Sequence, residues 1–169
     1  MSVQGCLVLV IALGAAWMDL LWEKVTNPWI WISWAVGLIY QISSYGPRGI
    51  GVYIGGMLTP ILVLLPLFLF RMMGAGDVKL FSALGGIIGF SAILQGIALS
   101  FLFGAILSAA FVIVCGNLSE RLWYFANYIT RFSHTKTIVP YYRRGQYAEN
   151  IHFTIPVLLG MMLYVGGFY

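Results

Sequence analysis

The chain has 169 residues, of which 61% are hydrophobic and only 8% are charged, and its mean hydropathy is +0.93. Its formal net charge is +4. A water-soluble domain needs more polar residues than this to cover its surface, so the composition excludes one. We therefore expect residues 1–169 to form a single all-α integral membrane domain, and the apolar runs leave room for six transmembrane helices of about 20 residues each.

The first half of the chain predicts three membrane spans separated by short polar breaks. Residues 3–21 form the first span, which lacks the basic start and the small-residue cleavage site of a signal peptide, so we expect it to be retained. Asn27-Pro28 breaks the helix after it. Residues 29–42 and 51–70 form the second and third spans.

The second half contains 36 residues without a charge, from 80 to 115. One helix of that length would reach about 54 Å, well beyond a hydrocarbon core of about 30 Å, so the run must fold back. We expect the break between residues 91 and 96, which gives a fourth span at 78–94 and a fifth at 96–115. Residues 152–169 form the sixth.

Residues 117–150 form the only sizeable polar segment, and we expect them to contain an amphipathic helix followed by a loop. Leu122, Phe125, Ile129 and Phe132 recur at helical spacing and would lie at the membrane interface. Basic and aromatic residues are interleaved in the loop, a pattern that also occurs in nucleic-acid binding. Beside a membrane the pattern favours lipid headgroups, so we expect the bilayer as partner and no nucleic acid.

The basic residues indicate the orientation of the chain. With six spans, Arg48 alone falls on one side of the membrane, and eight basic residues fall on the other: Lys24, Arg71, Lys79, Arg121, Arg131, Lys136, Arg143 and Arg144. The positive-inside rule places those eight in the cytoplasm and both termini outside. Asp19, at the end of the first span, and Asp77, at the start of the fourth, then share the cytoplasmic face.

Asp19 and Asp77 are the candidate catalytic residues. Asp19 lies inside an apolar run, where an ionisable group is costly and marks a functional site by default. Asp77 follows Gly74-Ala75-Gly76, where we expect unusual backbone conformations and close approach by substrate. Two neighbouring carboxyls cannot both ionise easily, so one would activate water while its protonated partner binds the substrate carbonyl.

Each of these residues also has a plainer interpretation. Asp77 could simply cap the fourth span after a tight turn. Glu23, four residues after Asp19, would share its helix face if the helix continued, and is either a surface charge or a contact for a substrate leader. His134 and His152 have no partner at ligand spacing, and the cysteines form no Cys-x-x-Cys pair, so we expect no metal site and no cofactor.

Two blocks of sequence resemble those of the type IV prepilin peptidases. Residues 74–80, Gly-Ala-Gly-Asp-Val-Lys-Leu, match the Gly-x-Gly-Asp-x-Lys-Leu signature of that family. The second block is an aspartate followed eight residues later by an asparagine, here Asp19 and Asn27, with Thr26 where the family usually has proline. The resemblance implies that Asp19 and Asp77 are catalytic and that Gly74, Gly76, Lys79 and Asn27 shape the site.

The resemblance also implies a substrate and a location. The substrate would be a prepilin or a pilin-like precursor, cut at the cytoplasmic face of a bacterial inner membrane between its leader and the helix that follows. The chain resembles the short members associated with Flp/Tad pili, which lack the N-terminal Cys-x-x-Cys region of longer members, so we expect cleavage without N-methylation.

Two alternatives remain open at this stage. Presenilin-like enzymes share Gly-x-Gly-Asp, but their first aspartate follows tyrosine, whereas Asp19 follows Met18. A non-enzymatic transporter or pilus-assembly subunit could use Asp19 and Asp77 to bind a cation or a proton. Such a protein would cleave nothing.

Overall fold

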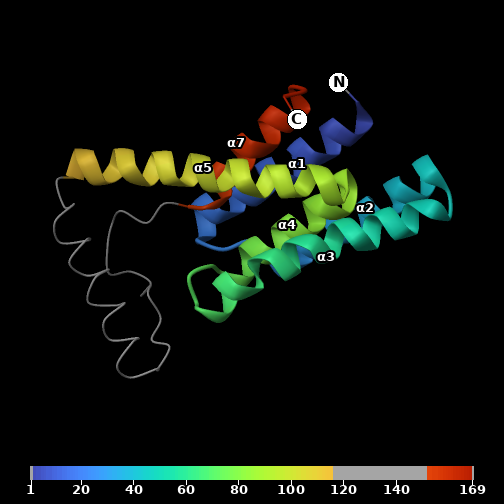
Figure 1. Cartoon of the computed structure of the whole chain (residues 1–169), viewed down its shortest axis with the longest axis horizontal. Helices are drawn as coiled ribbons and strands as arrows, with labels where there is room; N and C mark the ends of the chain where they lie inside the picture. Colours follow the sequence, from blue (N-terminus) through green and yellow to red (C-terminus); the bar gives the residue numbers. More distant parts are fainter. Residues whose placement is uncertain (1, 116–151, 169) are drawn as a thin grey trace.

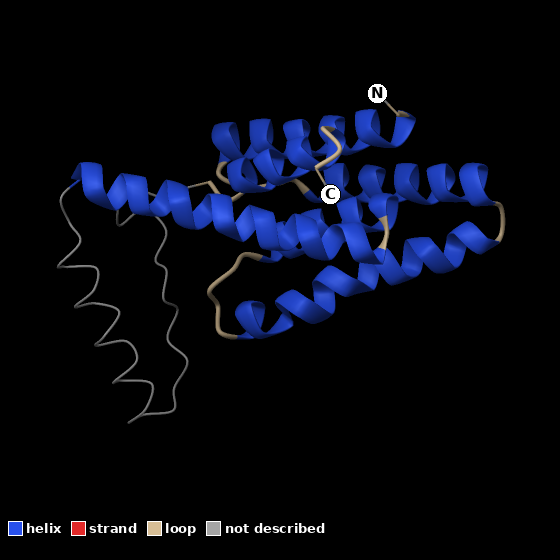
Figure 2. Ribbon diagram, turned by 45° about the horizontal axis from the view of Figure 1, so that its top comes forward, coloured by secondary structure: helices blue, strands red, loops and turns tan. Residues whose placement is uncertain are grey.

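A computed structural model describes residues 2–115 and 152–168, and all regular structure in them is helical (Figure 2). The expected all-α class is confirmed for these residues, while the segment 117–150 and His134 lie outside them. The helices are α1 (Val3–Trp22), α2 (Asn27–Tyr45), α3 (Arg48–Leu69), α4 (Ala75–Ile88), α5 (Phe90–Cys115) and α7 (Thr154–Val165).

The ends of α1 follow from its local sequence. The Ser2 hydroxyl accepts a hydrogen bond of 3.1 Å from the N–H of Gly5 and so caps the first turn. At the other end Glu23 takes a left-handed conformation with φ of 52°, and its N–H donates to the Asp19 carbonyl at 2.8 Å. Asp19 therefore belongs to the last turn of α1, and α2 starts after a short loop with Pro28 in its first turn.

Helix α4 is the centre of the molecule (Figure 1). Residues 80–87 are all buried, and α4 packs against α1, α2, α3 and α5. A helix that is buried all round can be apolar on every face, as this one is. Its closest neighbour is α3, where Gly56 and Gly85 leave no room for a methyl group between the two backbones. Small residues let membrane helices approach this closely.

Helix α4 is also short, and protein side chains cap its far end. Its 14 residues span about 21 Å, less than a hydrocarbon core of about 30 Å. The carbonyls of its last turn must find donors, because lipid offers none. The buried Gln41 donates from Nε2 to the carbonyls of Gly86 and Ile87 at 3.1 and 2.8 Å, and Gln4 donates to Ile87 at 2.8 Å.

The charge-free run folds back earlier than the sequence predicts. We expected the break between residues 91 and 96, but α4 ends at Ile88 and α5 begins at Phe90. Gly89 forms the turn with φ of 87°, a conformation that glycine adopts without steric cost. The predicted bounds 78–94 and 96–115 are therefore wrong: the fourth helix starts and ends earlier, and the fifth is longer.

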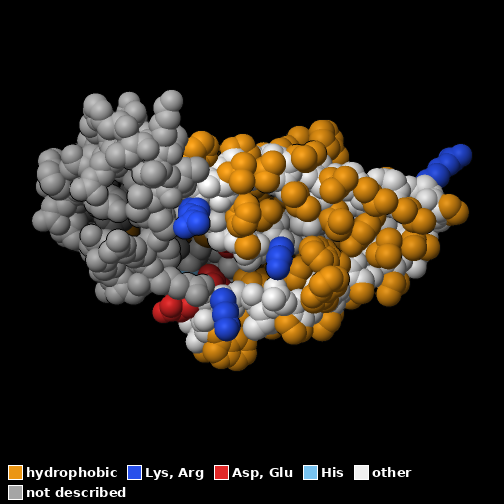
Figure 3. Space-filling model, turned by 90° about the horizontal axis from the view of Figure 1, so that it is seen from below, with side chains coloured by type: hydrophobic (Ala, Val, Ile, Leu, Met, Phe, Trp, Pro, Cys, Tyr) orange, Lys and Arg blue, Asp and Glu red, His pale blue; other side chains and the backbone are white. Residues whose placement is uncertain are grey.

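The outer surface is the one expected of a membrane protein. Large apolar side chains are exposed along α1, α3 and α5, and in Figure 3 they cover much of the surface that is seen. Helices α1 and α3, together with residues Phe90–Phe111 of α5, are long and apolar enough to cross a bilayer. Helices α2, α4 and α7 do not meet both criteria, so the count of six spans remains a prediction.

Candidate active site

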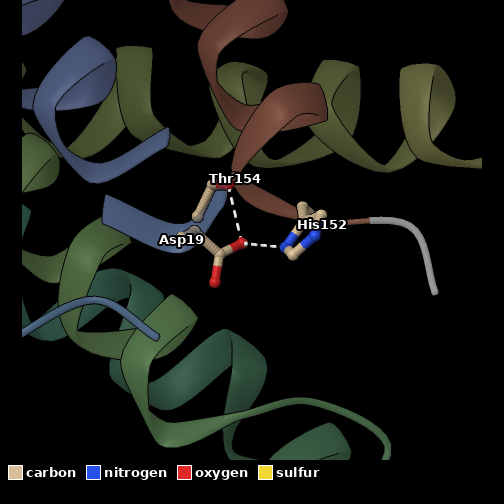
Figure 4. Close-up of polar contacts among 3 residues, drawn as sticks. All are labelled: Asp19, His152 and Thr154. Carbon is tan, nitrogen blue, oxygen red and sulfur yellow. Dashed lines mark hydrogen bonds and ion pairs between the residues drawn. The ribbon is translucent and has the colours of Figure 1, made fainter. Parts of the chain in front are cut away.

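Asp19 is held by the start of the last helix, although its side chain comes from α1. Its Oδ2 accepts a hydrogen bond of 2.9 Å from the Thr154 hydroxyl and lies 3.1 Å from Nδ1 of His152 (Figure 4). Thr154 is the first residue of α7 and is 1% exposed. The Asp19 side chain is 15% exposed. Its second carboxyl oxygen, Oδ1, points away from both partners (Figure 4).

His152 and Thr154 are functional candidates that the sequence analysis missed. The sequence predicts no partner for His152, whereas the structure places it against the Asp19 carboxyl group, 133 residues away in the chain. Sequence spacing carries no signal for a contact at such a separation. His152 and Thr154 are two residues apart in the sequence, at the start of a helix. This pattern indicates a site only once that helix is known to pack against α1.

Asp77 occupies the third position of α4, one turn after its N-cap residue Gly74. Its carboxyl group accepts a hydrogen bond from the backbone of Gly74, but the N-cap position that the plainer interpretation gave to Asp77 belongs to Gly74. Asp77 lies in the first turn, ahead of the apolar stretch of α4. Burial and the charge of Asp19 together raise the pKa of Asp77 to about 6, with burial the larger cause. The hydrogen bond from Gly74 acts in the other direction and lowers the pKa.

The two carboxyl groups lie at the same end of the molecule. Helix α1 packs against α4, and Asp19 lies in the last turn of the one while Asp77 lies in the first turn of the other. The Asp19 carboxyl is close enough for its charge to raise the pKa of Asp77. Figure 3 shows acidic side chains close to basic ones on the face that it presents. The Asp77 carboxyl group therefore interacts with the charge of Asp19 as well as with Gly74.

The glycines before Asp77 do not adopt the unusual conformations that the sequence suggested. Gly74 is extended, with φ of −74°, and Gly76 lies within the first turn of α4. What they provide is space. The Asp77 carboxyl oxygen would lie 3.3 Å from a Cβ at Gly74, and a Cβ at Gly76 would meet no atom of the described residues within 4 Å. Within the part of the chain that the structure describes, the backbone beside Asp77 is therefore open to the approach of another chain.

Asn27 and Lys79, one from each sequence block, are in direct contact. The Lys79 ammonium group donates a hydrogen bond of 3.1 Å to Oδ1 of Asn27, which is the first residue of α2. A cavity of about 140 Å³ adjoins the pair and is lined also by Ile30, Trp31 and Trp34. The bond ties the start of α2 to the first turn of α4, two residues from Asp77.

Glu23 is not placed as the sequence suggested. Glu23 would share a helix face with Asp19 only if the helix continued, and it does not, because α1 ends at Trp22 and Glu23 takes the left-handed conformation beyond it. Glu23 is exposed at the same end of the molecule as Asp19. Among residues 2–115 and 152–168, no group of three His, Cys, Asp or Glu side chains could hold a metal ion.

Together these features define a helical membrane protein with a pair of interacting aspartates at one end of its helix bundle. Residues 6–109 match the model of the type IV leader peptidase family, which covers α1 to most of α5. The chain belongs to this family of proteases. No curated protein and no solved structure gives a significant match. His152 and Thr154 lie beyond the matched residues.

Proposed function

We propose that this protein is a membrane aspartic endopeptidase that removes the leader of type IV prepilin-like precursors, with Asp19 and Asp77 as its catalytic groups. The observation that carries the proposal is that these two carboxyls, one from each sequence block, lie at the same end of the packed helices α1 and α4. The family match, which describes a leader peptidase, supports the reaction class. The open backbone at Gly76 supports the approach of an extended peptide beside Asp77.

The pair can hydrolyse a peptide bond with water alone. One ionised carboxylate takes a proton from water as the water oxygen bonds to the peptide carbonyl carbon, and the protonated partner gives its proton to the carbonyl oxygen. The tetrahedral diol then collapses. The first aspartate passes its proton to the leaving nitrogen as the C–N bond breaks, and the second recovers a proton from a diol hydroxyl. The products are a peptide with a new carboxyl terminus and a peptide with a new amino terminus. Both aspartates return to their starting protonation states.

The cytoplasmic face is the proposed location of the site. Among the described basic residues, Lys24, Arg71 and Lys79 belong to the end of the bundle that holds the two aspartates, whereas Arg48 starts α3 at the other end. This distribution supports the orientation that the positive-inside rule gives. The inner membrane, the Flp/Tad pilin precursors and the absence of N-methylation are proposed from the resemblance of the sequence.

Cleavage of a co-expressed pilin-like precursor tests the proposal. The native chain should release a product whose mass fixes the cut beside the leader, with an unmethylated new terminus. Asp19→Asn and Asp77→Asn remove the acid chemistry at nearly constant volume, and both should be silent while present in the membrane at native levels. Near-native cleavage by either variant would show that the two-carboxyl mechanism is wrong. A methylated product would contradict the proposed restriction to cleavage.

A further inference from the structure

Asp19 and Asp77 have unequal surroundings. Oδ2 of Asp19 accepts the Thr154 hydroxyl at 2.9 Å and lies 3.1 Å from His152 Nδ1, while Asp77 accepts a bond from its own helix at Gly74. Hydrogen bonds to the charged form of a carboxyl favour ionisation, and burial without such bonds opposes it. The surroundings therefore favour ionisation of one carboxyl group more than that of the other before any substrate binds.

The start of α7 adds to this difference. The 12-residue helix begins at Thr154, so the carboxyl group that Thr154 binds lies at its N-terminus. The N-terminal end of a helix carries partial positive charge and stabilises an anion within its first turn. Asp77 also lies in a first turn, that of α4, but there burial and the like charge of Asp19 both disfavour its ionised form.

We propose that His152 and Thr154 are positioning residues that hold Asp19 as the ionised carboxylate, so that Asp19 takes the proton from water and Asp77 is the proton donor. The inference rests on the proposed function and deepens it, because it assigns the two halves of the reaction to particular residues. Both bonds engage Oδ2, which leaves Oδ1 of Asp19 directed away from them (Figure 4).

The order of proton transfers follows. Oδ1 of Asp19 removes a proton from water as the new C–O bond forms, and Asp77 gives its proton to the carbonyl oxygen. Asp19 then gives the acquired proton to the leaving nitrogen as the C–N bond breaks, while Asp77 takes one back from a diol hydroxyl. Throughout, Oδ2 of Asp19 stays bound to α7, so the carboxylate cannot rotate out of place.

The chain allows a direct reading of the two protonation states, because Asp19 and Asp77 are its only aspartates. Carboxyl-¹³C aspartate incorporated into the full chain gives two NMR signals, which Asp19→Asn and Asp77→Asn assign. During a titration of the substrate-free protein, the Asp19 signal should be ionised at a pH where Asp77 is still protonated. Thr154→Val and His152→Leu should each shift the Asp19 signal toward its protonated position. The reverse order, or no response to either variant, overturns the inference.

The values of kcat and KM of variants provide a second test. Removing one hydrogen bond to a charged group costs about 1.5–3 kcal/mol, so Thr154→Val should lower kcat roughly 10- to 100-fold. KM should change less than about twofold, since neither residue binds substrate. Thr154→Ser keeps the donor and should recover most of kcat. The side-chain amide nitrogen in His152→Asn can replace Nδ1 as the hydrogen-bond donor. His152→Asn should therefore have a higher kcat than His152→Leu. Near-native kcat in Thr154→Val overturns the inference.

A matched control separates this effect from general loss of a buried hydroxyl. Thr59 is 6% exposed, and its hydroxyl donates a hydrogen bond of 2.7 Å to the Gly55 carbonyl of its own helix, so Thr59→Val should leave kcat near the native value. An equal loss in both valine variants would assign Thr154 a merely structural role. If either Asp→Asn variant still cuts, the proposed function itself fails. If both are silent and Thr154→Val is active, only the present inference fails.

Discussion

The carboxyl group of Asp77 accepts a hydrogen bond from its own helix and is opposed by the charge of Asp19. Burial and this charge together raise its pKa to about 6 from the ordinary 3.8, despite the Gly74 bond. At neutral pH the ionised form is therefore held at a cost in free energy of folding. An active site commonly retains such a cost, because the same surroundings that destabilise the group give it its reactivity.

Replacing this carboxyl group should stabilise the fold above pH 6. The folded pKa lies above the unfolded one, so the contribution of Asp77 to stability is fully present below about pH 4 and is lost as pH rises through about 6. The loss is on the order of 3 kcal/mol. Asp77→Asn should therefore have a higher thermal midpoint than the native chain at pH 8, with the difference narrowing toward pH 4, as measured by unfolding in detergent. A constant difference across that range would contradict this account.

The bond between Lys79 and Asn27 should matter more for cleavage than for stability. It is exposed, so losing it should cost less than about 1 kcal/mol of folding free energy. Because it fixes the first turn of α4 beside Asp77, Asn27→Leu and Lys79→Met should each lower kcat/KM about threefold to tenfold. The double variant should be no worse than either single one, since the two act through one bond. Additive losses would show independent roles.

At this scale the sequence predicted Asp19 and Asp77 but missed the partners of Asp19. A carboxyl inside an apolar run is visible without a structure, and the loop charges predicted its common side with Asp77. His152 and Thr154 become relevant only because α7 packs against the end of α1, a contact that depends on the whole arrangement of helices. The catalytic roles of all four residues remain predictions.

Among the helices, the contact of α3 with α4 allows the least change. Gly56 and Gly85 meet backbone to backbone, and the backbone of a packed helix cannot move aside as a flexible side chain can. This is how small residues work in membrane helix pairs. Because α4 carries Asp77, the contact also fixes where that carboxyl lies.

A methyl group at this contact should destabilise the protein strongly. Gly56→Ala would place Cβ against the Gly85 carbonyl, and overpacking of this kind typically costs about 1–3 kcal/mol. Gly55→Ala is the matched control, because a Cβ there meets nothing within 4 Å and alanine favours the helix. Thermal unfolding in detergent should show a lower midpoint for Gly56→Ala and an equal or higher one for Gly55→Ala. Equal midpoints would mean that the contact can relax.

Helix boundaries could be predicted where the sequence breaks sharply and not where it does not. Asn27-Pro28 and the charged residues after Phe70 separate α1 from α2 and α3 from α4 close to the predicted positions. Between residues 80 and 115 there is neither charge nor proline, and several glycines could each form the turn. Gly89 forms it, and Gln41, from a different helix, donates to the carbonyls of the turn before it, a contact that the sequence of the run does not contain.

At the scale of the whole molecule, the side-chain hydrogen bonds of α4 that the structure describes lie at its two ends. One end carries Asp77, and the other is bound by Gln41 and Gln4, from α2 and α1. Since the helix between is buried on every side, its position along the bundle is set by these ends and by the contact with α3.

Removing the Gln41 amide should therefore also affect the position of Asp77, at the opposite end of α4. Gln41→Leu leaves the Gly86 carbonyl without its side-chain donor and Ile87 with only Gln4, at a cost of about 1–3 kcal/mol. Gln4→Leu removes only one of two donors to Ile87 and should cost less. We expect a lower thermal midpoint and lower kcat for Gln41→Leu than for Gln4→Leu, measured on the same precursor. The reverse order would indicate that the far end does not fix α4.

The short central helix has a consequence for how the lipid environment acts on this protein. A thicker or thinner bilayer strains only the elements that face acyl chains, which tilt to relieve the mismatch. Helix α1 meets the lipid along an exposed apolar face and carries Asp19, whereas α4 is enclosed by protein and carries Asp77. Acyl-chain length thus acts directly on the helix that carries Asp19 and not on the helix that carries Asp77, and the hydrogen bonds of His152 and Thr154 to Asp19 hold that carboxyl group against the last helix.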